Sequence, residues 1–446
     1  MTENRPLACI ILAAGQGTRM KSKRPKALHH LAGRPLISWL IESAEKLEPE
    51  KIIVVTSPDA DELTKTVSPH QTAIQEKPFG TGDAVKAAMP LLEGFSGDVL
   101  ILLGDMPLIS PATMQDLIKA RYKTSATALS VLGAEFDTPP AFGRLVLGPD
   151  SALAKIIEDR DCNADEKSIN LCNLGAFCID GARLPEWLSK LKTDNAQAEY
   201  YLTDLVEIAA HDDLEAHVHV TRDHAEIHGV NDRIDLAKLE RTLQNRLREN
   251  AMKQGVTLID PKSVYFSYDT VIGQDVLIEP NVFFGPGVEI EDNVTIHAFS
   301  HIEGAKIEHD CNIGPYARIR PKSLLKSNVT IGNFIEVNRS TIGKGAKAKH
   351  VTYLGDTSID EQANIGAGTI VANYDGYEKH KTNIGKKAFI GSNATIVAPV
   401  NIGDGAIVAA GSTITYDVPK DALAIARVEG DVRPGWALER RKKKAS

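Results

Sequence analysis

The sequence predicts an α/β domain that a long helix joins to a parallel β-helix. Three observations predict this fold class. Strand-like and helix-like segments alternate over residues 1–232, leucines at helical spacing follow over 233–253, and an apolar residue then returns every six positions over 254–446. At 446 residues, the chain is long enough for each of the two larger segments to bury its own core.

The first segment, residues 1–232, combines short apolar runs with amphipathic stretches. Short apolar runs are typical of buried strands, and amphipathic stretches at helical spacing are typical of helices that cover a sheet. We expect strands at 8–13, 51–56 and 99–103, and helices at 36–47, 82–92 and 113–122. Their alternation predicts helices layered around a mostly parallel sheet.

The second segment, residues 233–253, has the pattern of one long amphipathic helix. Its leucines stand at helical spacing among charged residues, and neither glycine nor proline occurs before Gly255. These leucines are Leu236, Leu239, Leu243 and Leu247. Pro261 then opens the repeats.

The third segment has a period of six, which neither an α-helix (3.6) nor an alternating strand (2) produces. A coil with flat sides of about six residues produces it, with one apolar residue pointing inward on every side. A polar loop at 372–381 interrupts the period, and it is either a binding loop or an ordinary solvated loop. The three periodic runs are Ile272, Ile278, Phe284, Ile290, Ile296 and Ile302; Ile307, Ile313, Ile319, Leu325, Ile331 and Val337; and Ile384, Ile390, Ile396, Ile402, Val408 and Ile414.

Composition and charge are ordinary for a soluble protein, with 43% hydrophobic and 25% charged residues. The net charge of −8 argues against general nucleic-acid binding, and the basic run 440–444 is expected to be a solvated terminus. The apolar run near the N-terminus is too short for a signal peptide or a membrane span. The five cysteines show no zinc-like or redox spacing, so we expect reduced thiols and a cytoplasmic protein: Cys9, Cys162, Cys172, Cys178 and Cys311.

A glycine-rich loop, Leu12 to Met20, follows the first predicted strand, and Pro25-Lys26 comes shortly after it. Glycines at such a turn let backbone amides approach phosphates, and Arg19 and Lys26 supply positive charge. The spacing departs from the dinucleotide fingerprint at Met20, and the Gly-Lys-Ser/Thr of a P-loop is absent. The full string resembles the signature of sugar-phosphate nucleotidyltransferases, which implies a Rossmann-like mixed sheet.

Asp105 stands at the end of the predicted strand 99–103, where an ionised carboxylate is costly unless it meets a cation. A helix cap or turn would be the alternative role. The segment Gly229 to Asp232 resembles the second metal-binding segment of the same family, with Asn231 as an oxygen ligand. One carboxylate, one amide oxygen and substrate phosphates suit Mg²⁺. The resemblance therefore implies Mg²⁺ at Asp105 and Asn231.

Other positions match residues with which that family binds its substrates. The resemblance implies a nucleotide site with Gln75 and the Gly80-Thr81-Gly82 turn at the uracil, and catalytic charges from Arg19 and Lys26. The implied nucleotide-binding residues are Leu12, Ala13, Ala14, Gly15, Lys26, Gln75, Gly80 and Thr81. The implied sugar-phosphate residues are Gly143, Glu158, Asn173 and Asn231. The implied reaction is in-line attack on the α-phosphorus of UTP, with release of pyrophosphate.

The string Lys349 to Asp356 resembles an acetyltransferase signature, with His350 at the position of the catalytic base. A lone histidine is usually structural, but imidazole titrates near working pH and can remove an ammonium proton. The resemblance implies acceptor-binding residues Arg320, Asn338, Tyr353, Asn364 and Lys379. It implies acetyl-coenzyme A-binding residues Asn373, Tyr374, Ser392, Ala410 and Arg427.

Asn338 departs from this family pattern, which usually has a lysine at its position. The lysine helps to neutralise the phosphate of the acceptor, whereas Asn338 keeps a hydrogen-bond donor without the charge. Arg339 is adjacent, but consecutive side chains on an extended strand point to opposite faces. We therefore do not expect Arg339 to replace the lysine.

Both halves together, in this order, resemble the bifunctional bacterial enzymes that combine N-acetylglucosamine-1-phosphate uridyltransferase with glucosamine-1-phosphate acetyltransferase. The resemblance covers essentially the whole chain. It implies a left-handed β-helix of hexapeptide repeats, a homotrimer, Mg²⁺, and UTP and acetyl-coenzyme A as co-substrates, without nucleic-acid or membrane partners. Two alternatives stay open: a single-activity nucleotidyltransferase whose β-helix only oligomerises, and a non-enzymatic scaffold, in which Lys26 or Asp105 would be eroded.

Overall fold

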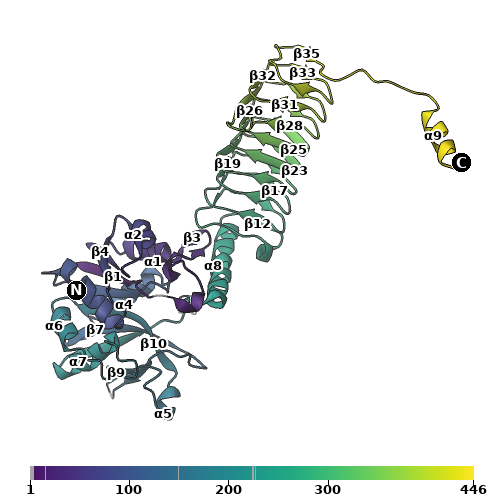
Figure 1. Cartoon of the computed structure of the whole chain (residues 1–446). Helices are drawn as coiled ribbons and strands as arrows, with labels where there is room; N and C mark the ends of the chain where they lie inside the picture. The colour runs from purple at the N-terminus through teal and green to yellow at the C-terminus, as the bar shows by residue number, and fades with distance from the viewer. Residues whose placement is uncertain (1–4, 16, 149, 224–225, 227, 446) are drawn as a thin grey trace. The chain divides into compact units, whose positions relative to one another are not determined.

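The computed structural model describes residues 5–15, 17–148, 150–223, 226 and 228–445. Gln16, in the glycine-rich loop, lies outside this part. The chain divides into two compact units, Met1–Leu243 and Gln244–Ser446 (Figure 1). Within the described ranges, no helix has the length and apolar character that crossing a membrane requires.

Helix α8 (Arg233–Lys253) confirms the predicted long helix. Leu239 and Leu243 are buried in the first unit, and Leu247 packs against the core of the second. Gly255 follows the helix with φ 101°, a left-handed conformation that glycine adopts at low cost. The division into units falls inside α8, so the boundaries at 232 and 253 stay a prediction.

The first unit is built on a mixed sheet with the strand order β11-β7-β10-β6-β1-β4-β5. Strands β6, β1, β4 and β5 are parallel, and β10 is antiparallel to both β6 and β7. The predicted strands are confirmed to within one residue. The strands are β1 (Leu7–Leu12), β4 (Lys51–Thr56), β5 (Gln71–Ile74), β6 (Asp98–Leu103), β7 (Thr127–Glu135), β8 (Arg144–Leu147), β9 (Leu153–Ile157), β10 (Leu171–Asp180) and β11 (Glu215–Val220), with a separate pair β2 (His30–Leu31) and β3 (Arg34–Pro35).

Both faces of this sheet are buried, which explains its continuous apolar strands. In β1, Ile10 packs into one apolar cluster and Ile11 into the other, because successive side chains point to opposite faces. The three predicted helices are confirmed as α1, α3 with η3, and α4. The helices are α1 (Leu36–Glu45), α2 (Asp61–Val67), α3 (Thr81–Ala88), α4 (Pro111–Ala120), α5 (Ala164–Lys167), α6 (Leu184–Lys190) and α7 (Leu205–His211), with 3₁₀ turns η1 (Thr18–Met20), η2 (Lys26–Leu28), η3 (Met89–Leu92) and η4 (Leu202–Asp204).

The second unit is a stack of parallel coils with three faces (Figure 1). The first face contains β12 (Thr257–Leu258), β14 (Leu277–Ile278), β17 (Thr295–Ile296), β20 (Asn312–Ile313), the first parts of β23 (Thr330–Asn338) and β25 (Lys347–Gly355), β27 (Asn364–Ile365), β30 (Phe389–Ile390), β33 (Ile407–Val408) and β35 (Leu423–Ala424). The second contains β15 (Phe283–Phe284), β18 (His301–Ile302), β21 (Arg318–Ile319), the second parts of β23 and β25, β28 (Ile370–Ala372), β31 (Thr395–Val397) and β34 (Thr413–Ile414). The third contains β13 (Val271–Ile272), β16 (Glu289–Ile290), β19 (Ala305–Ile307), β22 (Ser323–Leu325), β24 (Thr341–Ile342), β26 (Thr357–Ile359), β29 (Thr382–Ile384) and β32 (Val400–Ile402).

The coil length matches three sides of six residues. Thr295 pairs with Leu277, eighteen residues earlier, and with Asn312, seventeen residues later. The periodic apolar residues form one continuous core and are buried, except Ile272, which is partly buried. The prediction of a parallel β-helix from the six-residue period is thus confirmed.

The polar insertion loops out between β28 and β29. Asn364 pairs with Phe389 across a gap of twenty-five residues, seven more than a full coil of eighteen. Within the loop, Tyr374 and Lys379 form an antiparallel bridge. After the last coil the chain ends in an exposed helix, α9 (Trp436–Ala445).

Candidate active sites

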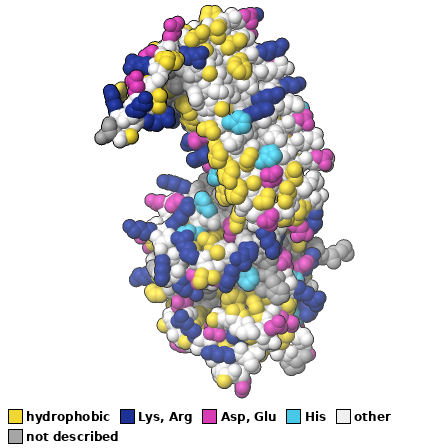
Figure 2. Space-filling model, turned by 90° about the vertical axis from the view of Figure 1, so that its right-hand side faces the viewer, with side chains coloured by type: hydrophobic (Ala, Val, Ile, Leu, Met, Phe, Trp, Pro, Cys, Tyr) yellow, Lys and Arg dark blue, Asp and Glu magenta, His cyan; other side chains and the backbone are white. Residues whose placement is uncertain are grey.

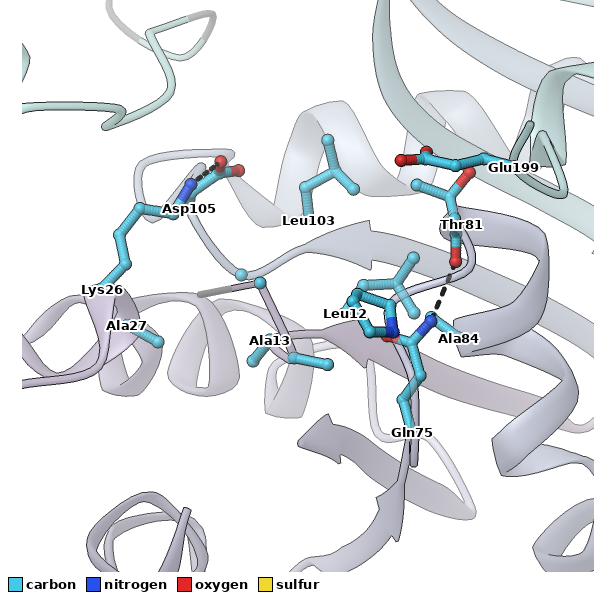
Figure 3. A pocket seen from close by; sticks show the side chains of 15 residues that line it. Leu12, Ala13, Lys26, Ala27, Gln75, Thr81, Ala84, Leu103, Asp105 and Glu199 are labelled. Atoms are coloured by element: carbon cyan, nitrogen blue, oxygen red, sulfur yellow. Dashed lines mark hydrogen bonds and ion pairs between the residues drawn. The ribbon is translucent and has the colours of Figure 1, made fainter. Parts of the chain in front are cut away.

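A cavity of about 280 Å³ lies in the first unit beside the loop that follows β1. Figure 3 shows Lys26 and Asp105 facing each other on one side of this cavity, with Gln75 and Thr81 on the other. The ammonium group of Lys26 is 2.5 Å from Asp105 Oδ2, so the two charges compensate each other. All the predicted nucleotide-binding residues line this cavity: Leu12, Ala13, Ala14, Gly15, Lys26, Gln75, Gly80 and Thr81.

Two glycines let the backbone come close to its neighbours here. Gly17 has φ 58°, and a Cβ atom on it would lie 2.8 Å from Cβ of Lys26. Gly80 has φ 105°, and a Cβ atom on it would lie 2.6 Å from the carbonyl oxygen of Tyr200. Any larger residue would displace these neighbours, and both φ values favour glycine.

Gln75 is fixed in one orientation. Its Nε2 donates to the carbonyl oxygen of Gly80 at 3.1 Å and to Asp83 Oδ2 at 2.9 Å. Both of these bonds use the amide nitrogen, so Oε1 is the acceptor that Gln75 can offer to a ligand.

A second cavity, of about 720 Å³, shares Thr81, Leu103 and Asp105 with the first. Arg19 also lines it. The predicted sugar-phosphate residues all line this second cavity: Gly143, Glu158, Asn173 and Asn231. The two predicted substrate sites of the first unit therefore meet at Asp105.

The segment Gly229–Asn231 runs beside Asp105. The N–H of Val230 donates to the carbonyl oxygen of Asp105 at 2.9 Å, and Arg19 Nη2 donates to Asn231 Oδ1 at 2.8 Å. A carboxylate and an amide oxygen are hard donors of the kind that Mg²⁺ prefers. Among the described residues, no group of three or more His, Cys, Asp or Glu side chains could hold a metal. The residues present fit an ion that takes its remaining ligands from substrate phosphates and water.

The sugar side of the second cavity is held together by one backbone and one side-chain hydrogen bond. The N–H of Asn173 donates to the carbonyl oxygen of Gly143 at 2.8 Å, and Thr203 Oγ1 donates to Glu158 Oε1 at 3.2 Å. Burial raises the pKa of the Glu158 carboxyl, and the bond from Thr203 partly offsets this shift. Asn173 precedes a break in the strand register at Gly175, whose φ is 76°. This irregularity directs β10 around the site.

Asp204 makes the stability of the first unit depend on pH. Burial, with help from Glu207 and Asp161, raises the pKa of Asp204 to about 6. A raised carboxyl pKa stabilises the folded state below the unfolded pKa, and this stabilisation is lost as the pH rises through about 6. Asp204→Asn should therefore raise the melting temperature at pH 8 by about 2–4 °C, after screening by solvent, and leave it unchanged at pH 4. A thermal melt followed by fluorescence of the buried Trp187 measures this, and an equal gain at both pH values would contradict it.

His350 lies on β25 directly opposite Asn333 of β23. Its Nδ1 is 3.0 Å from Asn333 Oδ1. An amide oxygen only accepts hydrogen bonds, so Nδ1 carries the hydrogen and Nε2 is the basic nitrogen. The histidine is exposed. An imidazole with a fixed tautomer and an accessible Nε2 is what a general base requires.

His350 shares one corner of the β-helix with Ser392 and Ala410, two of the five predicted acetyl-coenzyme A residues, whereas Asn373 and Tyr374 lie in the insertion loop. His350, Ser392 and Ala410 each follow, by two residues, a buried apolar residue of the first face. These apolar residues are Ala348, Ile390 and Val408. The carbonyl oxygen of Ser392 accepts from the N–H of Gly411 at 2.8 Å, and Arg427 Nη1 donates to the carbonyl oxygen of Ala410 at 2.9 Å. The coils thus stack residues that are far apart in the sequence into one column.

Four polar residues form a connected network where the second face ends. Arg339 donates Nε and Nη2 to the two carboxylate oxygens of Asp356, each at 2.7 Å, and Nη1 to Asn338 Oδ1 at 3.2 Å. Asp356 also accepts from Nδ2 of Asn373, at the start of the insertion loop. The bond from Arg339 is the main cause that lowers the pKa of Asp356, so this carboxylate is ionised. Asn338 and Asn373 are thereby brought together.

The geometry expected for Arg339 is wrong. The expectation assumes an extended strand with diverging side chains, but β23 ends at Asn338 and Arg339 has φ 50°. This turn brings the two side chains into contact. Arg339 still offers little charge to a ligand, because the two bonds to Asp356 compensate its guanidinium.

The other predicted residues of the second unit lie on several elements. Arg320 Nη1 donates to Glu336 Oε1 at 2.7 Å, and Glu336 stands opposite Tyr353 in the paired strands. The remaining three are Asn364 on β27, and Tyr374 and Lys379 in the insertion loop. Within the described part of one chain, no hydrogen bond or ion pair joins these three to His350.

Sequence reasoning missed several residues that hold the predicted ones in place. Asn333 fixes His350, Asp356 fixes Asn373 and Arg339, and Thr203 bonds to Glu158. A coil spacing of seventeen links Asn333 to His350, and this spacing could have identified Asn333. No comparable signal identifies Thr203, because its contact with Glu158 comes from the packing of separate elements.

The fold and the two sites define a transferase with an α/β nucleotide-binding unit and a hexapeptide-type β-helix. The family model of the MobA-like NTP transferase domain matches residues 9–164. Those of the bacterial transferase hexapeptide (six repeats) and of the hexapeptide repeat of succinyl-transferase match 269–304 and 381–416. The second unit is therefore consistent with the expected left-handed β-helix.

Full-length relatives then give the family. The bifunctional protein GlmU of Zymomonas mobilis is 45% identical to the chain, covering 100% of it and 99% of the relative. The GlmU proteins of Paramagnetospirillum magneticum and Sphingopyxis alaskensis are 47% and 48% identical, each covering 99% of the chain and, respectively, 98% and 99% of the relative. The chain belongs to the family of bifunctional GlmU proteins.

Proposed function

We infer that this chain is a bifunctional enzyme of UDP-N-acetylglucosamine synthesis. It acetylates glucosamine-1-phosphate with acetyl-coenzyme A and then transfers UMP from UTP to N-acetylglucosamine-1-phosphate, releasing pyrophosphate. Full-length bifunctional relatives and the two kinds of transferase match support both activities and disfavour a single-activity enzyme. The intact Arg19, Lys26 and Asp105, which line the two cavities, disfavour the scaffold alternative.

For uridylyl transfer, the residues of the first unit position two substrates around Asp105. The loop amides, Arg19 and Lys26 bind and neutralise the triphosphate, while Gln75 Oε1 accepts a hydrogen bond from the N3–H of uracil. Glu158 and the other sugar-phosphate residues hold the acceptor so that its phosphate oxygen lies in line with the α-phosphorus. Catalysis thus rests on positioning and charge neutralisation.

Asp105 and Asn231 would hold Mg²⁺, which when bound neutralises charge on the triphosphate and the leaving pyrophosphate. The fit rests on their hard oxygen donors and on the place of Asp105, which lines both cavities. Arg19 and Lys26 bond to Asn231 and Asp105, so the two basic side chains lie close enough to reach phosphates bound there.

For acetyl transfer, His350 Nε2 removes a proton from the ammonium group of glucosamine-1-phosphate. Asn333 keeps Nδ1 protonated and thereby keeps Nε2 basic. The free amine attacks the thioester carbonyl, the C–S bond breaks, and the departing thiolate takes up the second proton that the nitrogen loses as the amide forms. The column formed by Ser392, Ala410 and Arg427 binds the coenzyme along the same corner.

The His350–Asn333 pair is the observation that most favours two activities over one. A β-helix used only for oligomerisation needs no exposed histidine with a fixed tautomer. The test is incubation with glucosamine-1-phosphate, acetyl-coenzyme A, UTP and Mg²⁺, followed by mass spectrometry of the products. UDP-N-acetylglucosamine should form only when all four are present. Failure to form N-acetylglucosamine-1-phosphate when UTP is omitted would remove the acetyl activity.

Asn338→Lys should lower the KM for glucosamine-1-phosphate by about ten- to hundredfold, because a charge-assisted bond to phosphate is worth about 1.5–3 kcal/mol. The charges of Arg320 and Arg339 are already compensated by Glu336 and Asp356. Steady-state kinetics of acetyl transfer measure the change, which added salt should reduce little because Asn338 is buried. If Asn338→Lys has no effect while Arg339→Ala raises this KM sharply, Arg339 binds the phosphate instead.

We also propose a homotrimer that works in the cytoplasm and completes its acetyl sites between neighbouring subunits. An exposed aromatic ladder on the β-helix supports self-association: Phe299 stacks on Tyr316, and Tyr316 on Phe334, each with ring centroids 4.9 Å apart. These side chains are 51%, 46% and 57% exposed, and Figure 2 shows hydrophobic side chains gathered on the second unit. Phe334 directly follows Asn333, so a subunit that covers the ladder reaches the vicinity of His350. The five free cysteines suit a reducing compartment.

A further inference from the structure

Arg233, the first residue of α8, contacts the segment that contains Lys26 at both of its ends. Its Nε donates to the carbonyl oxygen of Met20 at 3.3 Å, and its Nη1 lies 3.3 Å from Nδ1 of His29. Met20 directly follows Arg19, and His29 comes three residues after Lys26. One guanidinium group therefore bridges the two ends of residues 20–29.

His29 transmits this contact to Lys26. Its side chain is buried, at 6% exposure, and its backbone N–H donates to the carbonyl oxygen of Lys26 at 3.2 Å. Arg233 is a donor only, so His29 must present the lone pair of Nδ1, which requires a neutral ring. Burial first, then the charge of Arg233, lowers the pKa of His29 and favours this neutral form. A shift of His29 would move the turn η2 that begins at Lys26.

The same end of α8 holds the predicted metal segment. Asp235 accepts from the backbone N–H of Asn231 at 3.2 Å, and Glu240 accepts from the backbone N–H of Ala32 at 2.8 Å. The first turns of α8 are thus bonded both to Asn231 and to the chain on either side of Lys26. Arg233 itself makes the bonds to Met20 and His29, and Asp235, two residues later, makes the bond to Asn231.

We propose that Arg233 is a positioning residue for uridylyl transfer: it fixes Arg19 and Lys26 relative to Asp105 and Asn231. The proposal rests on the proposed function of this site. Arg233 acts through the backbone at Met20 and through His29, so it need not touch a substrate. The sugar-side residues Gly143, Glu158 and Asn173 come from other elements. Loss of Arg233 should therefore change the rate of the reaction more than it changes binding of the sugar phosphate.

Arg233→Met should lower kcat of uridylyl transfer by about ten- to hundredfold, the cost of displacing catalytic groups by a fraction of an ångström to an ångström. The KM for N-acetylglucosamine-1-phosphate should stay within about twofold, because Gly143, Glu158 and Asn173, three of its four predicted binding residues, lie on elements that Arg233 does not contact. Arg241→Met, which removes an exposed arginine further along α8, is the matched control and should keep parent kinetics. A parent protein without uridylyl transfer would refute the proposed function, whereas equal kcat in parent and Arg233→Met would refute only this inference.

Variants of His29 test whether Arg233 acts through that ring. Glutamine offers an acceptor oxygen to Arg233 and leucine offers none. His29→Gln should keep most of the activity, and His29→Leu should lose it as Arg233→Met does. The double variant Arg233→Met/His29→Leu should lose no more than the worse single variant, because the two residues act as one unit. Additive losses would contradict the proposal.

Tryptophan fluorescence separates positioning from folding. Two of the three tryptophans, Trp39 and Trp187, lie in the first unit, and Trp436 lies in the exposed terminal helix. A thermal melt by fluorescence therefore reports mainly on the first unit. Arg233→Met should melt close to the parent, and Arg233→Lys should show an intermediate kcat. A melting temperature well below that of the parent in both variants would show that Arg233 only supports the fold and would overturn the proposal.

Discussion

Asp105→Ala should abolish uridylyl transfer and leave acetyl transfer at the parent level, and His350→Ala should do the reverse. Asp105 lines both cavities of the first unit and pairs with Lys26, so its loss removes the proposed Mg²⁺ ligand and leaves Lys26 without its carboxylate partner. We expect at least a hundred- to thousandfold loss of kcat, about the effect of removing one preorganised electrostatic group. His350 lies in the second unit, which has a separate core.

Two assays on the same preparations measure this separation. One follows pyrophosphate release from UTP and N-acetylglucosamine-1-phosphate, and the other follows free thiol from acetyl-coenzyme A. The partly exposed Asp116 and the exposed His309 provide matched controls, and Asp116→Ala and His309→Ala should keep both activities. If either active-site variant loses both activities while its circular dichroism is unchanged, the assignment of one activity to each unit is wrong.

Tyr316→Asp should dissociate the proposed trimer and abolish acetyl transfer while sparing uridylyl transfer. Tyr316 stacks on both Phe299 and Phe334 at the centre of the aromatic ladder. A carboxylate buried there without a partner costs several kcal/mol in each of the covered ladders, which is enough to separate subunits. Light scattering measures the mass of the particle, and the thiol assay measures acetyl transfer.

Val271→Asp is the control for a charge placed on the β-helix. Val271 is 61% exposed and lies on the third face, away from the strands that carry the ladder. It should keep both the trimer and acetyl transfer. A monomeric parent with full acetyl transfer would rule out the proposed assembly, and a trimeric Tyr316→Asp would show that the ladder lies outside the subunit contacts.

The β-helix could be predicted from the sequence because almost every side of every coil carries one inward apolar residue, about six positions after the last. Ile296 and Ile313 are buried in the same core because both belong to the six-residue period, which is visible in the amino-acid sequence. The nucleotide site could be located because Gly15 and Asp105 come two or three residues after strands that are parallel neighbours, so the ends of these strands meet.

Contacts between distant residues could not be predicted in this way. Arg233 meets His29 across about two hundred residues, and neither residue belongs to a recurring spacing. The side chain of Arg339 was expected on the opposite face from Asn338. This is wrong because the positive φ of Arg339 ends β23 at Asn338, and the sequence pattern does not reveal this φ. The raised pKa of Glu158 depends on burial by several elements at once.

The insertion between β28 and β29 shows where a protein of this design can change during evolution. The coils before and after it keep their pairing, since Thr357 stands opposite Thr382, and Ile370 opposite Thr395, across the extra residues. Lengthening or replacing the loop leaves the ladder of backbone bonds intact, whereas one residue gained within a strand would turn the inward side chains that follow on that strand outward. Exchange of this single segment, which carries the predicted site residues Asn373, Tyr374 and Lys379, should therefore alter the proposed acetyl site while the column of Ser392, Ala410 and Arg427 stays unchanged.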